Sequence, residues 1–420
     1  MTNPKHPGYS HVRFMLEAFT LKGKYGDHLC IVYDVLREPI DECRDKYLGG
    51  AFSSTKLRVL LPALLQGLDY MHAECHVVHT DLKADNIMMG LGSDPSGVLE
   101  RFAQHQHLHP SPRKPPDSHD GHIIYQSCSD LLLVGDKDNG KSMSDAVLAS
   151  AKITDIGLAE WGDRGLQHKA IQSNAFTCPE VLLGVGWSYP ADIWNLGVML
   201  WDLIETNGLF DHIKTQPGQY KAEEHLALMI TLLGMPPNDY LDRGLKTAKY
   251  FSWDKEKQEY VFINQKKLQQ FKHVISWDQC ITRMQGDNKA SFIDFAKKMI
   301  AWVPEERWTA AQLLEHPWLK GRPGSITCTC QDFEQASRSL SEGKEKDSVL
   351  EKDKDSTVAS VASSSAQSDA PDYFSKLSPK TSHDTSPPKP TISTRTTNSS
   401  FMSMESIKDR IPSLVVTPSR

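Results

Sequence analysis

The sequence lacks the features that mark several large classes of protein. Its eight cysteines include no CxxC pair, and Cys328-Thr-Cys330 is too closely spaced for a usual zinc site. The longest apolar run, Ile193–Ile204, contains Asn195 and Asp202 and is too short to span a bilayer. No signal-peptide pattern is present, so we expect reduced thiols in an intracellular protein, cytoplasmic or nuclear. A disulfide framework and a membrane protein are thereby excluded.

The sequence also has no excess of positive charge. Its 47 Lys and Arg residues face 53 Asp and Glu residues, which gives a formal net charge of −6. This balance argues against a general nucleic-acid binder and is compatible with a basic partner, although an ordinary solvated surface explains it more simply. We expect no direct contact with nucleic acid or membrane, and a monomer.

Large apolar residues are scarce in two stretches. Residues 92–150 are rich in Pro, His, Asp and Ser, which indicates a loop insertion within a domain. Residues 321–420 contain too few apolar side chains to offset the entropy of ordering, so we expect a disordered tail. The rest of the 420-residue chain is long enough for one large globular core.

Helices dominate the expected secondary structure after residue 55. Two strands come first, His11–Phe19 and Leu29–Tyr33, joined by a turn at Gly23–Asp27, and the apolar second strand reads as buried. Thr55–Cys75 repeats Leu at three- and four-residue spacing and predicts an amphipathic helix. Further helices are expected at Asp192–Glu205, Ala222–Leu233, Ala290–Trp302 and Thr309–Glu315.

The segment Val77–Met89 carries the chemistry that is most specific. It contains Asp81, Lys83 and Asn86 on one short loop after the long helix. Phosphoryl transfer needs these three groups: a carboxylate to orient the attacking hydroxyl, a cation near the transferred phosphate, and an oxygen ligand for magnesium. A polar loop of no chemical role is the alternative.

A second carboxylate follows in Lys152-Ile-Thr-Asp155-Ile-Gly157-Leu-Ala159. The first segment resembles the protein-kinase catalytic loop, with His-Thr-Asp for His-Arg-Asp, and the second resembles its Asp-Phe-Gly. The resemblance implies that Asp81 is the catalytic base and Lys83 touches the transferred phosphate. It also implies that Asn86 and Asp155 bind Mg²⁺ with ATP, and Gly157 is expected to permit the turn that aims Asp155.

Further motifs follow in the order found in that family. Cys178-Pro-Glu180 resembles Ala-Pro-Glu, and Asp192 opens an apolar helix. By resemblance, Glu180 pairs with Arg307 in a buried ion pair, and the buried Asp192 accepts backbone hydrogen bonds from the catalytic loop. The expected fold is α+β and protein-kinase-like, with a mainly helical large lobe.

The resemblance departs from the family at the amino end. Tyr33-Asp34-Val35-Leu36 resembles the hinge, where the backbone of Asp34 and Leu36 would hold adenine, but no Gly-rich loop precedes it, and Lys5, Lys22 and Lys24 are in the wrong context for the strand Lys. We therefore expect residues 1–36 to be a remnant of the small β lobe, most of it missing, and residues 37–320 to be the large lobe. An active kinase with an incomplete sequence and a weak or inactive scaffold both fit.

The finer resemblance is to the SR-protein-specific kinases, in particular the fungal ones. It rests on His79-Thr80-Asp81, on the insertion, and on Trp187-Ser-Tyr-Pro-Ala-Asp-Ile-Trp194. It implies a protein substrate, possibly Arg/Ser-rich. Kinases with Arg at position 80 use it to grip an activation-loop phosphate, which Thr80 cannot do, so we expect no dependence on such a phosphate. Phe176-Thr177-Cys178-Pro179 replaces the usual Tyr-Arg-Ala-Pro and puts the geometry of the substrate pocket in doubt.

Two other patterns have simpler explanations. Gly135–Ser142 spells a P-loop and would suggest a nucleotide-triphosphate hydrolase, but it places Asp136 and Asp138 in a phosphate cradle and lies between two kinase motifs, so we interpret it as a flexible turn. Five histidines in a Pro-rich stretch favour a solvated segment over a metal site. They are His105, His107, His109, His119 and His122.

Overall fold

The computed structural model describes residues 3–23, 25–113, 126, 143–213, 220–272 and 275–321. All of them belong to one compact unit. The P-loop pattern at 135–142, His119, His122, Lys24 and the predicted disordered tail also lie outside the described residues. The predictions made for those segments stay predictions.

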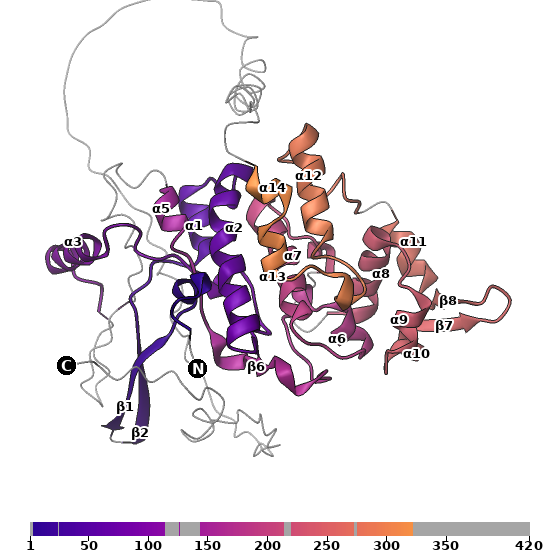
Figure 1. The fold of residues 1–420 in the computed structure, drawn as a ribbon, viewed down its shortest axis with the longest axis horizontal. Helices are drawn as coiled ribbons and strands as arrows, with labels where there is room; N and C mark the ends of the chain where they lie inside the picture. Colours follow the sequence, from indigo (N-terminus) through magenta and orange to yellow (C-terminus); the bar gives the residue numbers. More distant parts are fainter. Residues whose placement is uncertain are drawn as a thin grey trace, which may run out of the picture. The chain divides into compact units, whose positions relative to one another are not determined.

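Helices form about half of the described chain (Figure 1). The helix expected from Thr55 is α2, Ser54–Asp69, which begins at an N-cap formed by Ser53 and continues as a π-turn, Tyr70–Glu74. The helix expected at Ala222–Leu233 is α8, with the same bounds. The other α-helices described outside residues 92–150 are α1 Ile40–Tyr47, α6 Pro179–Leu183, α7 Pro190–Ile204, α9 Asn238–Asp242, α10 Thr247–Tyr250, α11 Gln265–Phe271, α12 Gly286–Lys297, α13 Ala310–Leu314 and α14 Pro317–Lys320.

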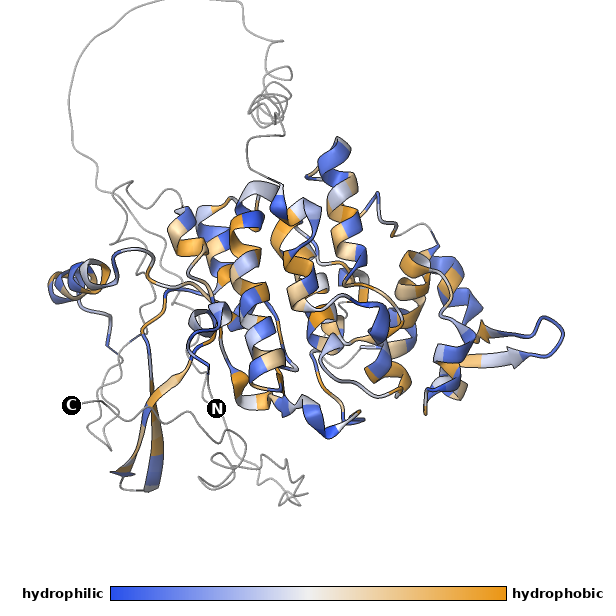
Figure 2. Ribbon diagram, viewed as in Figure 1, coloured by the Kyte–Doolittle hydropathy of each residue, from blue (hydrophilic) through white to orange (hydrophobic). Residues whose placement is uncertain are grey.

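Helices α2 and α7 supply many of the core residues. The apolar side of α2 is buried, and α7 is buried around almost its whole circumference, including Trp194 and Trp201. An apolar helix that is buried on all sides belongs to the centre of a domain. Helix α13 packs on α2, and the apolar positions of both appear in Figure 2. The tryptophans at 194, 201, 302 and 318 are all buried, as expected of core residues.

The first two strands pair only with each other in the described residues. Strand β1, Met15–Gly23, runs antiparallel to β2, Gly26–Tyr33. The prediction of a buried second strand is wrong, since Leu29 and Ile31 are 43% and 39% exposed. A strand that is apolar on both faces is typical of a sheet covered on both sides, and no described helix or further strand covers this one. Figure 2 shows the apolar stretches along the hairpin.

Two short antiparallel ladders bring distant segments together. Strand β3, Val77–Val78, pairs with β6, Glu160–Trp161, and β4, Ile87–Met88, pairs with β5, Lys152–Ile153. The loop between β3 and β4 and the loop between β5 and β6 therefore lie side by side. A third ladder joins β7, Phe251–Asp254, to β8, Glu259–Phe262.

The predicted insertion contains helices that its composition did not suggest. Helix α3, Pro95–Leu108, begins with Asp94 as N-cap and Pro at the first turn, and α5 spans Asp145–Leu148. Both features of α3 are ordinary signals of a helix start. The loop was predicted nevertheless, because the segment contains so many polar residues. Within the described ranges, no helix combines the length and the apolar character that crossing a membrane would require.

Candidate active site

The loop between β3 and β4 holds three of the predicted site residues in contact. Lys83 Nζ lies 2.9 Å from Asp81 Oδ2, and Asn86 Nδ2 donates to the Asp81 carbonyl at 2.9 Å and to its Oδ2 at 3.4 Å. The 3₁₀ turn Ala84–Asn86 places Asn86 back toward Asp81. The hydrogen bond to Asp81 raises the pKa of Lys83, and the negative charges of Asp81, Asp85 and Asp155 act in the same direction. Lys83 is therefore a cation at neutral pH.

Asp155 lies beside this loop. Its neighbour Thr154 donates from both N–H and Oγ1 to the Asn86 carbonyl, at 2.9 and 3.0 Å. Because the field of Asp155 reaches Lys83, the two segments share one electrostatic environment. The backbone turn occurs at Asp155 itself, with φ of 58°, and not at Gly157. We expected Gly157 to permit the turn that aims Asp155, but the left-handed residue of the turn is Asp155, and a Cβ added at Gly157 would meet only Asp155 Oδ1, at 3.6 Å.

Asp192 holds the backbone at the start of the loop between β3 and β4. This fully buried carboxylate, in the first turn of α7, accepts from the N–H of His79 at 2.7 Å and of Thr80 at 2.9 Å. The predicted backbone contacts are thus present. His72 Nε2 lies 2.8 Å from the same carboxylate, a contact that the sequence reading missed. The His79 ring extends the network, with Nε2 2.8 Å from the Thr154 carbonyl.

Glu180 and Arg307 form the predicted buried ion pair. Arg307 Nη1 donates to Glu180 Oε1 and Nη2 donates to Oε2, each at 2.8 Å. Neither side chain is exposed. Arg307 also donates to the carbonyls of Ala301 and Pro190. Burial alone would lower the pKa of Arg307, but Glu180 outweighs it and the pKa is raised. The pair joins the start of α6 to the segment before α13.

The segment after β2 contains the residues expected to hold adenine. The Asp34 carbonyl accepts from Arg13 Nη2 at 3.0 Å, and the Arg13 guanidinium lies over the Tyr33 ring, 4.7 Å from its centroid. Leu36 is only 8% exposed, and its backbone makes no hydrogen bond to any described residue. Sequence reasoning missed Arg13, because a lone Arg before a strand carries no signal of a partner 21 residues away.

The oxygen atoms of Asn86 and Asp155 suit magnesium. Asn86 uses its amide nitrogen toward Asp81, which leaves Oδ1 as a possible ligand, and Asp155 offers an exposed carboxylate. No group of three or more His, Cys, Asp or Glu in the described chain could hold a metal. Magnesium is commonly bound by one or two carboxylates plus substrate phosphates, so this small ligand set fits the ion only together with a nucleotide.

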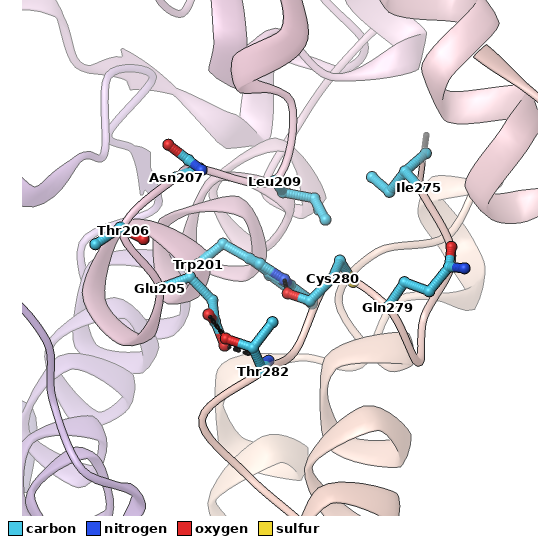
Figure 3. Close-up of a pocket in the computed structure, with 10 residues that line it drawn as sticks. Trp201, Glu205, Thr206, Asn207, Leu209, Ile275, Gln279, Cys280 and Thr282 are labelled. Atoms are coloured by element: carbon cyan, nitrogen blue, oxygen red, sulfur yellow. Dashed lines mark hydrogen bonds between the residues drawn. The ribbon is translucent and has the colours of Figure 1, made fainter. Parts of the chain in front are cut away.

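A cavity of about 210 Å³ lies elsewhere, at the carboxyl end of α7 (Figure 3). Trp201, Leu209 and Ile275 form part of its wall. Glu205 in this wall accepts from the N–H and hydroxyl of Thr282, at 2.8 and 2.6 Å. Its carboxylate is thus occupied by the chain itself, and none of the predicted site residues lines the cavity. We interpret it as a packing gap between α7 and the 275–282 segment.

The chain resembles known proteins in both sequence and structure. Residues 133–319 match the family model described as protein kinase domain. The serine/threonine protein kinase AFUB_078980 of Aspergillus fumigatus is 32% identical over 319 residues, which cover 75% of this chain and 70% of that protein. Serine/threonine-protein kinase SRPK of Physarum polycephalum is 27% identical over 318 residues, covering 74% and 71%. The crystal structure of the PF14_0431 kinase domain superposes with a TM-score of 0.51 at 21% identity, over 76% of this chain and 80% of that one.

Proposed function

This chain belongs to the protein kinase family, among its serine/threonine kinases, and on that premise we propose that it is catalytically active. It transfers the γ-phosphate of ATP to a serine or threonine hydroxyl of a protein. The observation that supports the proposal best is the contact of Asp81, Lys83 and Asn86 on one loop, with Asp155 beside it.

Each of these residues has a separate role. Asp81 orients the attacking hydroxyl and accepts its proton, and Lys83, paired with Asp81 in this structure, stabilises negative charge on the transferred phosphate. Asn86 and Asp155 would hold Mg²⁺, which would neutralise phosphate charge when it is bound with ATP. Asp34 and Leu36 contact adenine through their backbone. The Leu36 backbone makes no hydrogen bond within the described chain, whereas the Asp34 carbonyl already accepts from Arg13.

The proposed substrate is a protein rich in Arg and Ser. This follows from the resemblance of His79-Thr80-Asp81 to the SR-protein kinases and from the similarity to the Physarum kinase whose name carries SRPK. The formal net charge of −6 is compatible with a basic substrate.

Activity is proposed to be independent of activation-loop phosphate. Thr80 offers no cation to a phosphate, and Thr177 is buried, with its hydroxyl donating to the Ser173 carbonyl at 3.1 Å. Ser173 is exposed. Phosphatase treatment, or the substitution Ser173→Ala, should leave the rate of transfer within about twofold of the untreated chain. A loss of more than tenfold in the rate measured with an Arg/Ser peptide would contradict this.

A non-catalytic scaffold is the second candidate. The observation that favours it is the exposed β1–β2 hairpin, which ends at the hinge without a described sheet around it. Lys5 lies before the first 3₁₀ turn and Lys22 lies next to the hairpin turn, opposite Asp27. Neither position is that of the family's phosphate-binding strand Lys.

The purified 420-residue chain, compared with its Asp81→Asn and Asp155→Asn variants, separates the two candidates. We expect Asp81→Asn to lower kcat by about 10²–10⁴-fold and to keep Mg²⁺-dependent thermal stabilisation by ATP. Asp155→Asn should lose that stabilisation. The control is Asp278→Asn, which removes an exposed carboxylate paired with Lys289. The scaffold is favoured if the unsubstituted chain neither transfers phosphate nor shows Mg²⁺-dependent stabilisation by ATP.

A further inference from the structure

Thr80 has a backbone conformation that disfavours threonine. Its φ is 72°, in the left-handed region, where a β-branched residue is a genuine outlier. Glycine or asparagine would adopt it with less strain. Strain of this kind persists where the surrounding structure uses the residue, so the contacts of the Thr80 side chain need an explanation.

The side chain and the backbone of Thr80 have different partners. The N–H donates to Asp192 Oδ1 at 2.9 Å, which fixes the backbone to α7. Oγ1 donates to the carbonyl of Leu158 at 3.0 Å, 78 residues further along the chain. Thr80 is 2% exposed, so water competes little for this bond. The hydroxyl therefore links the catalytic loop directly to the segment after Asp155.

The end of that segment has few other anchors. Ile156–Leu158 is a single 3₁₀ turn with Asp155 at its N-cap, and the partly buried Ile156 packs against the core. The Leu158 side chain is 66% exposed, so packing does not fix the end of the turn. The next described anchor is the ladder between β3 and β6, which begins at Glu160. Among the described residues, the bond from the Thr80 hydroxyl is the long-range hydrogen bond that reaches the backbone of residues 156–159.

We propose that Thr80 is a positioning residue whose hydroxyl holds the Ile156–Leu158 turn, and through it Asp155, in the orientation that binds magnesium-nucleotide. The inference rests on the proposed function, because the role of Asp155 does. A single neutral hydrogen bond then does within the chain what a phosphate paired with arginine does in switchable kinases. The strained backbone of Thr80 brings Oγ1 within reach of the Leu158 carbonyl.

The test compares Thr80→Val, which keeps the branched shape without the hydroxyl, with Thr80→Ser, which keeps the hydroxyl. Thr247→Val is the matched control, because Thr247 is also buried and its Oγ1 donates to the Leu241 carbonyl at 2.6 Å. The first measurement is hydrogen exchange of residues 153–162 without nucleotide. The second is the Mg²⁺ concentration that gives half-maximal phosphate transfer and half-maximal thermal stabilisation by ATP.

We expect Thr80→Val to speed exchange in 153–162 and to raise the half-maximal Mg²⁺ concentration about five- to tenfold, the size of one hydrogen bond. Thr80→Ser should stay near the unsubstituted chain, and Thr247→Val should change neither measurement. Unchanged exchange in Thr80→Val overturns the proposal, and so does faster exchange with an unchanged Mg²⁺ requirement. If the unsubstituted chain binds no Mg²⁺-ATP, the proposed function fails and the positioning of Asp155 fails with it. The exchange data then still report whether the Thr80 bond orders the turn.

Discussion

His225 lies fully buried in α8, with Nδ1 3.0 Å from the Tyr220 hydroxyl and its ring edge-on to Phe210. Burial lowers its pKa to about 3, well below the value of 6.5 of an exposed histidine. The native state therefore keeps His225 neutral at pH values where the unfolded chain binds a proton. Because the unfolded state binds more protons, stability falls as pH drops from about 6.5 toward 3.

We expect His225 to contribute a loss of about 2.5 kcal/mol in the free energy of unfolding between pH 7 and pH 4.5. His225→Phe keeps a ring against Phe210 and removes the titration, so its stability should depend less on pH by that amount. Urea unfolding at the two pH values measures the difference. An unchanged pH dependence in the variant would show that His225 is not the group responsible.

Residue types on one short loop pointed to Asp81, Lys83 and Asn86, and the resemblance to the kinase motifs added Asp155 and the Glu180–Arg307 pair. The contacts within the loop and the ion pair are present. The partners of Arg13 and His72 were not predictable. His72 meets Asp192 across 120 residues, and nothing local to His72 signals that contact. Glycine is the usual residue with positive φ, but aspartate, with its short polar side chain, also tolerates that conformation. The left-handed residue of the turn is therefore Asp155 and not Gly157.

Helix α7 supports the site directly, since its first turn carries Asp192. Asp192→Asn would place an amide nitrogen or a neutral oxygen against two backbone N–H donors and His72. We expect a loss of about 3 kcal/mol in the free energy of unfolding and faster hydrogen exchange at His79 and Thr80.

Glu205→Gln, after the other end of α7, is the control for this prediction. Glu205 is also buried and accepts hydrogen bonds, from Thr282 and Arg283. It should lower stability in urea unfolding and leave exchange at His79 and Thr80 unchanged. Equal exchange effects from both variants would mean that α7 acts through general stability and not through Asp192.

Element prediction succeeded where hydrophobic periodicity was long and regular, as in α2 and α8. It failed for the burial of β2. An apolar strand predicts a helix or sheet packed on each of its faces, but the sequence of the strand cannot show whether such a partner is present. It also failed for α3, which buries only Val98 and so shows little periodicity in its apolar residues. Local capping signals, not burial, define that helix.

On the scale of the molecule, stability should be uneven. Two-stranded hairpins without a packed face are marginally stable in water, and β1–β2 exposes Leu29, Ile31 and Tyr33 by 43%, 39% and 37%. We expect its amides to exchange through local opening, at a free energy several kcal/mol below that of α2. Native-state hydrogen exchange of peptides 15–33 and 54–69 measures both.

The β7–β8 hairpin is an internal control for this measurement. It is also two-stranded, but its Phe251 and Phe262 are each 1% exposed. It should therefore be better protected than β1–β2. Equal protection of β1–β2 and α2 would contradict the expectation and would indicate that the hairpin is covered in solution, for example by a second molecule.

The β4–β5 ladder has a consequence for how this chain can change over time. The segment between Met88 and Lys152 contains the predicted insertion, and these two residues pair in the ladder. Near its two ends, Gly92 lies against Val147. The two ends of this segment are thus held next to each other. Doubling the length of the segment would lower the free energy of unfolding by only about 0.6 kcal/mol, through the entropy of loop closure. Insertions, deletions and substitutions in this segment during evolution should therefore leave the geometry around Asp81 and Asp155 unchanged.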